Sequence, residues 1–273
     1  MNPRSLILAS MVGVGAVGFS MHGQGGGVLY TPLQLVFGVP FHVAAVQSLW
    51  LTILTALSAV LLFRKEQQVD WKLSVVLESS SFLGAFGSGY FARLFSSTTL
   101  SIGLAVLLVA SGIVMLADLS PRAASSGLRS RLEWVRFRAG QTYRIHLGKG
   151  LPLSFLIGIM SGLTGAAGGF LKIPMLVRLF GVPIKVAFGS SAFMVSLTAA
   201  GGLLGHVATG AVQWHHPLLL GAFVLVGSQI GPRIALRSRP ETIRKRFSAY
   251  LFAIALLVLA TLWFSPAPIE PVS

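Results

Sequence analysis

Long apolar segments separated by short polar connections dominate this sequence. They cover residues 5–21, 26–38, 43–63, 72–93 and 98–117 and then, after a polar stretch, 151–166, 168–180, 184–205, 215–236 and 247–264. A helix needs about 20 apolar residues to cross a hydrocarbon core roughly 30 Å thick, and most of these segments approach that length. Only 10% of the 273 residues are charged, against about 25% in soluble proteins. The sequence therefore predicts an all-α polytopic membrane protein, not a soluble enzyme, a secreted disulfide scaffold or a nucleic-acid-binding domain.

The lysines and arginines orient these segments. They gather around 64–72, throughout 118–150 and around 237–246, whereas the connections 38–42, 94–97, 206–214 and 265–273 contain neither residue type. Positively charged loops remain in the cytoplasm. We therefore expect a protein of the cell inner membrane with both termini outside and 118–150 in the cytoplasm.

Residues 118–150 admit two interpretations. Leu128, Leu132, Trp134, Val135 and Phe137 lie among arginines, and such a mixture is typical of a helix that lies on the anionic inner leaflet. The alternative is a solvated linker whose charges only set the topology.

The two halves of the chain repeat each other at an offset of 142 to 143 residues. The tetrapeptide Phe37–Pro40 recurs unchanged as Phe180–Pro183. Further matches pair Gly26, Gly27, Leu29, Pro32, Thr55 and Trp71 with Gly168, Gly169, Leu171, Pro174, Thr198 and Trp214. An ordered series of Gly, Pro and Trp indicates a duplication. Each half of about five segments has an odd number of crossings, so we expect inverted repeats, as in secondary transporters: 1–117, the cytoplasmic linker 118–150, and 151–273.

A glycine cluster stands at the same place in each half. Gly23–Gly27 precedes Pro32, and Gly165–Gly169 precedes Pro174. Such glycines can simply let helices pack closely. They also permit an unwound backbone, and a short broken helix that restarts after the break points its N–H groups and positive dipole end at an anion. We expect the two ends to face a shared, water-accessible pocket. The candidate anion-binding backbone comprises Gly25, Gly26, Gly27, Gly165, Gly168 and Gly169.

This repeated pattern of glycine cluster, spacer and proline, followed by Gly-Val-Pro and an Ala-rich segment carrying Ser, resembles the sulfite exporter TauE/SafE family of membrane permeases. The resemblance covers nearly the whole chain except 118–150. It implies export of sulfite, an organosulfonate or a related sulfur oxyanion or carboxylate. With inverted halves we expect transport by alternating access, and a passive anion channel of the same architecture is the alternative. We expect a small anion and membrane lipid as partners, no nucleic acid, no cofactor, no metal and no catalytic residue; a homo-oligomer stays open.

Polar residues near the glycine clusters are candidates for substrate binding. His22 and Gln24 flank the first cluster and Thr164 flanks the second. Gln47 and Ser48 align with Ser190 and Ser191 at the start of the following segments. His22 could instead be a packing residue, and serines often bond back to their own helix.

Two ionisable residues lie inside apolar segments, where charge is costly and usually functional. Lys172 either contacts the anion or extends to cytoplasmic water with Arg178 and Lys185. Glu78 either couples transport to protons or pairs with a base such as Lys72, although that residue is not on the same helix face.

Overall fold

The computed structural model describes residues 3–116, 132–166, 168–208 and 215–239, with a few further positions between 242 and 256. The helices of the first part are α1 (Pro3–Met21), α2 (Gly27–Val36), α3 (Phe41–Lys65), α4 (Trp71–Phe91) and α5 (Ser97–Leu116), with a 3₁₀ turn, η1 (Ala92–Leu94), after α4. The second part contains α6 (Leu147–Thr164), α7 (Gly169–Pro174), the π-helical η2 (Met175–Leu179), α8 (Ile184–Val207) and α9 (His215–Arg237). Nine of the ten predicted segments thus coincide with described helices; the tenth, 247–264, lies largely outside the described residues.

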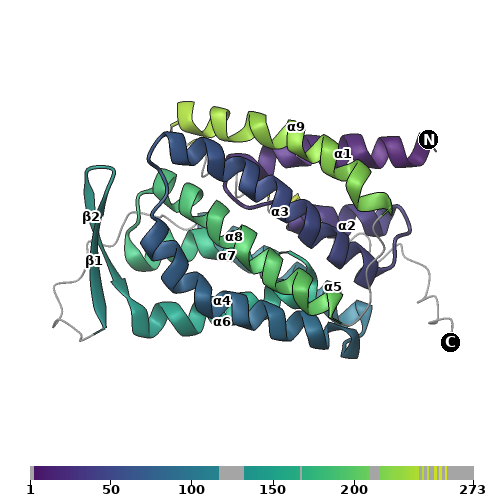
Figure 1. The fold of residues 1–273 in the computed structure, drawn as a ribbon, viewed down its shortest axis with the longest axis horizontal. Coiled ribbons are helices and arrows are strands. Elements are labelled where there is room, and N and C mark those ends of the chain that lie inside the picture. Colours follow the sequence, from purple (N-terminus) through teal and green to yellow (C-terminus); the bar gives the residue numbers. More distant parts are fainter. Residues whose placement is uncertain are drawn as a thin grey trace.

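The long helices run along the long axis of the molecule (Figure 1). Among the described helices, α3, α6 and α8 are long and apolar enough to cross a membrane by themselves. Large apolar side chains also face outward from other helices, with Val14 74%, Leu83 65% and Val226 68% exposed. Exposed apolar surface of this kind fits contact with lipid. The fold is therefore that of a helical membrane protein.

Small residues let the helices approach closely. A Cβ atom at Gly84 of α4 would lie 2.5 Å from the Phe155 carbonyl oxygen of α6. A Cβ atom at Gly227 of α9 would lie 2.1 Å from the Gly13 carbonyl oxygen of α1. Backbone-to-backbone packing of this kind is common between membrane helices.

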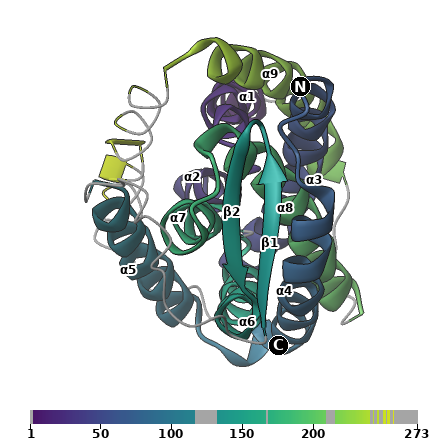
Figure 2. The same cartoon turned by 90° about the vertical axis from the view of Figure 1, so that its left-hand side faces the viewer.

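A β-hairpin precedes α6. Strands β1 (Glu133–Arg138) and β2 (Gln141–His146) are antiparallel, with Arg138 opposite Gln141 next to the turn. Both turn residues have positive φ, 49° at Ala139 and 74° at Gly140, as a tight two-residue hairpin turn requires. The hairpin lies across one end of the helices (Figure 2).

The predicted inner-leaflet helix is therefore wrong for residues 133–146. The side chains alternate with a period of two, because Val135 and Phe137 are exposed while Trp134, Arg136 and Arg138 are half-buried. Alternation with this period is the signature of a strand. Leu132 occupies a turn immediately before β1. Leu128 and the rest of 118–131 lie outside the described residues.

The hairpin attaches to the α3–α4 connection through Asp70, whose side chain is buried. Arg136 donates from Nη2 to Oδ1 (2.6 Å) and from Nε to Oδ2 (3.0 Å), and the Tyr143 hydroxyl donates to Oδ2 (2.5 Å). Asp70 also caps α4 by accepting from the Leu73 N–H. Burial alone would raise the pKa of Asp70, but the hydrogen bonds from Arg136 and Tyr143 hold it below its usual value.

Candidate functional site

The helical path is interrupted at both glycine clusters. Helix α1 ends at Met21 and α2 begins at Gly27, and between them Gly23, Gly25 and Gly26 have φ values of 67°, 73° and 89°. Helix α6 ends at Thr164 and α7 begins at Gly169, with φ of 72° at Gly165 and 65° at Gly168. These angles belong to the left-handed region, which glycine adopts without steric cost.

The two interruptions lie against each other. A Cβ atom at Gly27 would lie 2.4 Å from the Gly165 carbonyl oxygen, and one at Gly169 would lie 2.9 Å from the Cα of Gln24. Thr52 of α3 and Val195 of α8 stand beside them, because a Cβ atom at Gly25 would lie 2.5 Å from one and 2.7 Å from the other. Segments about 140 residues apart in the sequence therefore meet between α3 and α8.

Some buried polar atoms at this meeting point have no hydrogen-bond partner within the described part of the chain. Gln24 is fully buried, and neither its Nε2 nor its Oε1 has a partner among the described residues. The Thr52 hydroxyl, and the hydroxyl of Ser191 one turn before Val195 on α8, likewise have no hydrogen-bond partner among the described residues. Burying an amide or hydroxyl without a hydrogen bond costs roughly 1–3 kcal/mol by protein mutational data. A cluster of such groups is a candidate for contact with a polar ligand.

Other predicted residues have partners that belong to the fold. His22 is 2.8 Å from the Gly18 carbonyl oxygen through Nδ1 and packs edge-on against Phe188. The Thr164 hydroxyl donates to the Met160 carbonyl one turn earlier (2.7 Å). His22 therefore has the contacts expected of a packing residue, and Thr164 bonds back to its own helix.

The aligned polar pairs of α3 and α8 have different surroundings. The Gln34 side-chain amide donates to the Ser48 hydroxyl (3.0 Å). Gln47, which precedes Ser48, is also buried. Ser190 accepts from the Asp70 backbone N–H (2.9 Å) and so lies near the hairpin end of α4. Ser191 is fully buried. Ser190 therefore has a partner in the α3–α4 connection, whereas the Ser191 hydroxyl has none among the described residues.

Lys172 and Glu78 form a fully buried ion pair. The Lys172 Nζ is 2.8 Å and 3.0 Å from the two Glu78 carboxylate oxygens, and their side chains are 0% and 1% exposed. Thr198 hydrogen-bonds to both residues, and Ser81 contacts the Thr198 hydroxyl at 2.9 Å. The site joins α4, α7 and α8.

This pair overturns two of the alternatives drawn from the sequence. Lys172 does not extend to water, whereas Arg178 is exposed and Lys185 donates to the Leu236 carbonyl. Glu78 does not pair with Lys72, which is exposed on another face of α4. A charge inside a membrane protein needs a partner, and here the partner comes from the other half of the chain.

Sequence reasoning missed the role of Thr198, although the repeat carried the signal. Thr198 aligns with Thr55, and Lys172 aligns with Tyr30. The Tyr30 hydroxyl is 2.9 Å from the Thr55 hydroxyl, just as Lys172 contacts Thr198. The same two positions therefore touch in both halves. In the first half both side chains are neutral, whereas in the second half one of them is the charged Lys172.

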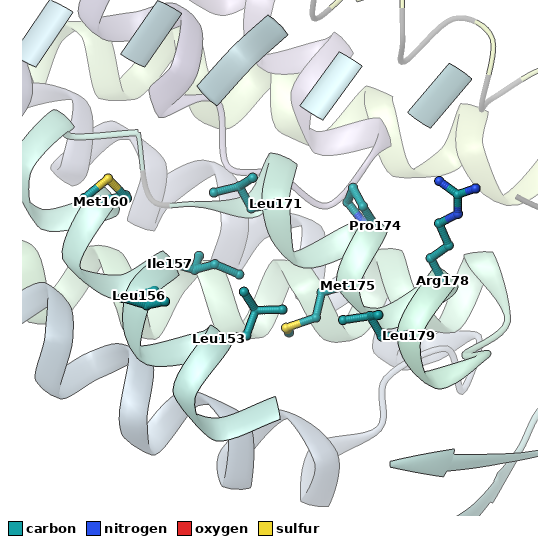
Figure 3. A pocket seen from close by; sticks show the side chains of 9 residues that line it. All are labelled: Leu153, Leu156, Ile157, Met160, Leu171, Pro174, Met175, Arg178 and Leu179. Atoms are coloured by element: carbon teal, nitrogen blue, oxygen red, sulfur yellow. The ribbon is translucent and has the colours of Figure 1, made fainter. Parts of the chain in front are cut away.

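The water-accessible pocket expected at the glycine breaks is not open. The described residues of both clusters are buried. A pocket of about 390 Å³ lies instead between α6 on one side and α7 and η2 on the other (Figure 3). A second, of about 300 Å³, lies between α4 and α6. Apolar side chains line most of both pockets, which therefore do not suit a small anion.

Comparison with known proteins gives a consistent assignment. A family model described as "Sulfite exporter TauE/SafE" matches residues 7–258. The chain is 28% identical over 251 residues to the probable membrane transporter protein YunE of Bacillus subtilis, covering 88% of this chain and 92% of the relative. It is 27% identical over 271 residues to a probable membrane transporter protein of Xylella fastidiosa strain Temecula1, covering 97% and 99%. No solved structure matches.

These relatives, together with the apolar helices, support a membrane location and a role in membrane transport. The match extends over nearly the whole chain, from α1 to the positions after α9. The chain belongs to the sulfite exporter TauE/SafE family.

Proposed function

We propose that this protein is a secondary transporter that exports a small oxyanion across the inner membrane by alternating access. The substrate class is sulfite, an organosulfonate or a related sulfur oxyanion or carboxylate. The family description names sulfite, and the site described above has the donor chemistry that an oxyanion needs.

Two inverted repeats form the transporter in this proposal. Contacts between the two halves that recur at matching positions support it. The approach of Gly84 to Phe155 is matched by that of Gly227 to Gly13. Likewise, a Cβ atom at Gly162 would lie 2.2 Å from the Ser88 hydroxyl, and one at Gly231 would lie 2.2 Å from the Ser20 hydroxyl. Each pair of contacts is related by the same offset as the sequence repeat.

The hairpin end of the molecule faces the cytoplasm in this proposal, and both termini lie outside. Helix α1 begins at the end of the bundle opposite the hairpin (Figure 1). Arg136, Arg138, Arg144 and Lys149 all belong to the hairpin or to the first turn of α6, in agreement with the rule that positive loops remain inside.

The observation that carries the binding site is the buried Gln24 amide without a hydrogen-bond partner among the described residues. It lies where the amino end of the ten-residue helix α2 meets the second glycine cluster. Its Nε2, the Thr52 and Ser191 hydroxyls and backbone N–H groups of the glycines would donate to the oxyanion, because an anion accepts such bonds strongly. Lys172 would supply charge.

The remaining predicted residues would form the surroundings of this site. The side chains of His22, Gln47, Ser48 and Thr164 are all buried. The buried state of the glycine clusters corresponds in this proposal to an occluded conformation, and opening toward either side would require the two halves to move relative to each other.

Flux measurements test the proposal. Purified protein in liposomes should accumulate sulfite or a sulfonate when a driving gradient is imposed, and Gln24→Leu should reduce that flux at least tenfold. Flux that never accumulates anion against its gradient and runs far faster than carrier turnover would favour the channel. No flux of any sulfur oxyanion would refute both.

Glycine variants provide a matched control. Gly26→Leu and Gly168→Leu should abolish flux, because both positions have positive φ and a Cβ atom at either would lie within 2.5 Å of another side chain. Gly87→Leu should retain flux, because nothing lies within 4 Å of a Cβ atom there. Thermal stabilisation by sulfite reports binding independently of flux.

A further inference from the structure

The Glu78–Lys172 pair limits how a charge can enter the protein. Among the described residues, Lys172 is the only lysine or arginine that is buried, and Glu78 already neutralises it. An anion that joined this pair would leave one uncompensated negative charge in a medium of low dielectric constant, where such a charge is very costly.

The hydrogen bonds of Lys172 lead to the same conclusion. An ammonium group has three N–H donors. Its contacts are Glu78 Oε1, Glu78 Oε2 and the Thr198 hydroxyl. All three donors are therefore in use, and an anion can bind Lys172 only by displacing one of these partners.

The groups around Glu78 leave Lys172 as its charged partner. Thr198 and Ser81 are neutral. The titratable residues on the elements that pack against α4 lie elsewhere: Lys149 is exposed at the start of α6, Lys185 donates to Leu236 from the start of α8, and His206 contacts the Gly162 carbonyl two turns beyond Thr198. On α4 itself, Asp70 is held by the hairpin.

We propose that the transported oxyanion and the Glu78 carboxylate compete for Lys172, and that Glu78 takes up a proton from water when it is displaced. The inference rests on the proposed transport function. The ammonium then pairs with the anion, and the neutral Glu78 carboxyl group keeps a hydrogen bond with Thr198. Charge balances on both sides of the exchange, so one proton accompanies each monovalent anion through the protein.

The repeat explains why the ratio is one to one. The position that matches Lys172 in the first half is Tyr30, which contacts Thr55, and the position that matches Glu78 in the second half is Gly221. The described structure therefore contains one exchangeable acid–base pair, not two.

The test uses methanesulfonate, which stays a monovalent anion across the neutral pH range and so carries no proton itself. In liposomes containing wild-type protein and a pH-sensitive dye, methanesulfonate flux should move one proton per anion in the same direction. As the pH rises, the affinity for methanesulfonate should fall by up to tenfold per pH unit wherever Glu78 is ionised in the free protein. Flux without proton movement, or an affinity that is independent of pH, would overturn the inference.

Variants sharpen the result. Glu78→Gln should bind methanesulfonate with no pH dependence and should transport it without protons, so that its flux responds to membrane voltage. Glu66→Gln, which changes an exposed carboxylate at the end of α3, should behave as wild type. If Glu78→Gln fails to fold, the neutral double variant Glu78→Gln/Lys172→Met should fold and lose binding; retention of wild-type affinity would contradict the proposal.

Failure of this inference is distinguishable from failure of the proposed function. If the wild-type protein moves sulfite or methanesulfonate without protons, the transport function stands and the exchange at Lys172 is wrong. If it moves no anion and binds none, the transport function itself is wrong.

Discussion

Helix α4 carries two buried carboxylates that pair with different basic residues. Asp70 caps its amino end and Glu78 lies eight residues further along, about 12 Å away at 1.5 Å per residue. Both side chains are at most 1% exposed, and each forms an ion pair with another part of the chain. Asp70 meets the guanidinium of Arg136, whereas Glu78 meets the ammonium of Lys172.

The basic partner distinguishes the two ion pairs: arginine favours a fixed structural contact, and lysine favours a contact that can be exchanged. Arginine stays protonated under all ordinary conditions and holds a carboxylate with two parallel hydrogen bonds. Asp70 has both of these bonds, a third from Tyr143 and a fourth from the Leu73 N–H. Lysine offers a compact charge on a flexible chain. The comparison indicates that Asp70 holds the hairpin in place while Glu78 can change partners.

The largest difference is expected between Lys172→Met and Arg136→Met. Loss of the buried charge should reduce anion flux roughly a hundredfold, because hydrogen bonds to charged groups contribute about 1.5–3 kcal/mol. Arg136→Met should keep flux within about threefold of wild type per folded molecule, since its guanidinium contacts Asp70 and the Trp134 ring of its own hairpin and no candidate binding residue. Equal losses in liposome assays would remove the distinction between the two pairs.

Asp70→Asn should lower stability by about 3 kcal/mol, because breaking a buried pair leaves Arg136 without its counter-ion. Thermal unfolding of detergent-purified protein measures this loss. Glu133→Gln is the control, because Glu133 pairs with Arg144 at 3.5 Å and the Arg144 side chain is 40% exposed; its effect should stay below about 1 kcal/mol. Proton coupling of Asp70→Asn should equal that of wild type.

The contribution of Asp70 to the stability of the fold should depend on pH in the acid range. Its pKa is lowered in the folded protein, whereas an aspartate in the unfolded chain has a pKa of about 3.9. The stabilisation is therefore complete above that value and is lost as the pH falls through the lower folded pKa. The unfolding temperatures of wild type and Asp70→Asn should converge in strong acid; a constant gap would show that Asp70 contributes nothing through its ionisation.

The smallest effect is expected for Tyr143→Phe, which removes one of the four hydrogen bonds to Asp70. A single hydrogen bond to a charged group accounts for about 1.5–3 kcal/mol, and Arg136 remains in place to hold the carboxylate. The loss of stability should therefore be less than that of Asp70→Asn, and flux should not change. A loss as large as that of Asp70→Asn would mean that Tyr143, not Arg136, is the main anchor.

Much of the helical layout could be predicted, because hydrocarbon forces the backbone to satisfy its own hydrogen bonds within each segment. The segments 5–21 and 184–205, for example, correspond to α1 and α8. The hairpin was missed. Arginines mixed with apolar residues fit either an inner-leaflet helix or a solvated linker, although Trp134, Arg136 and Arg138 alternate with Val135 and Phe137 and a turn at Ala139–Gly140 follows.

The sequence alone determined that this chain is a helical membrane protein of the TauE/SafE family, because apolar length, charge position and the glycine motifs are local properties of the chain. Only the tertiary structure decided which residues meet. Lys172 and Glu78 are 94 residues apart, and Asp70 and Arg136 are 66 apart. A charged side chain inside the protein takes whatever partner the packing of the helices brings within reach, and no spacing along the chain specifies that choice.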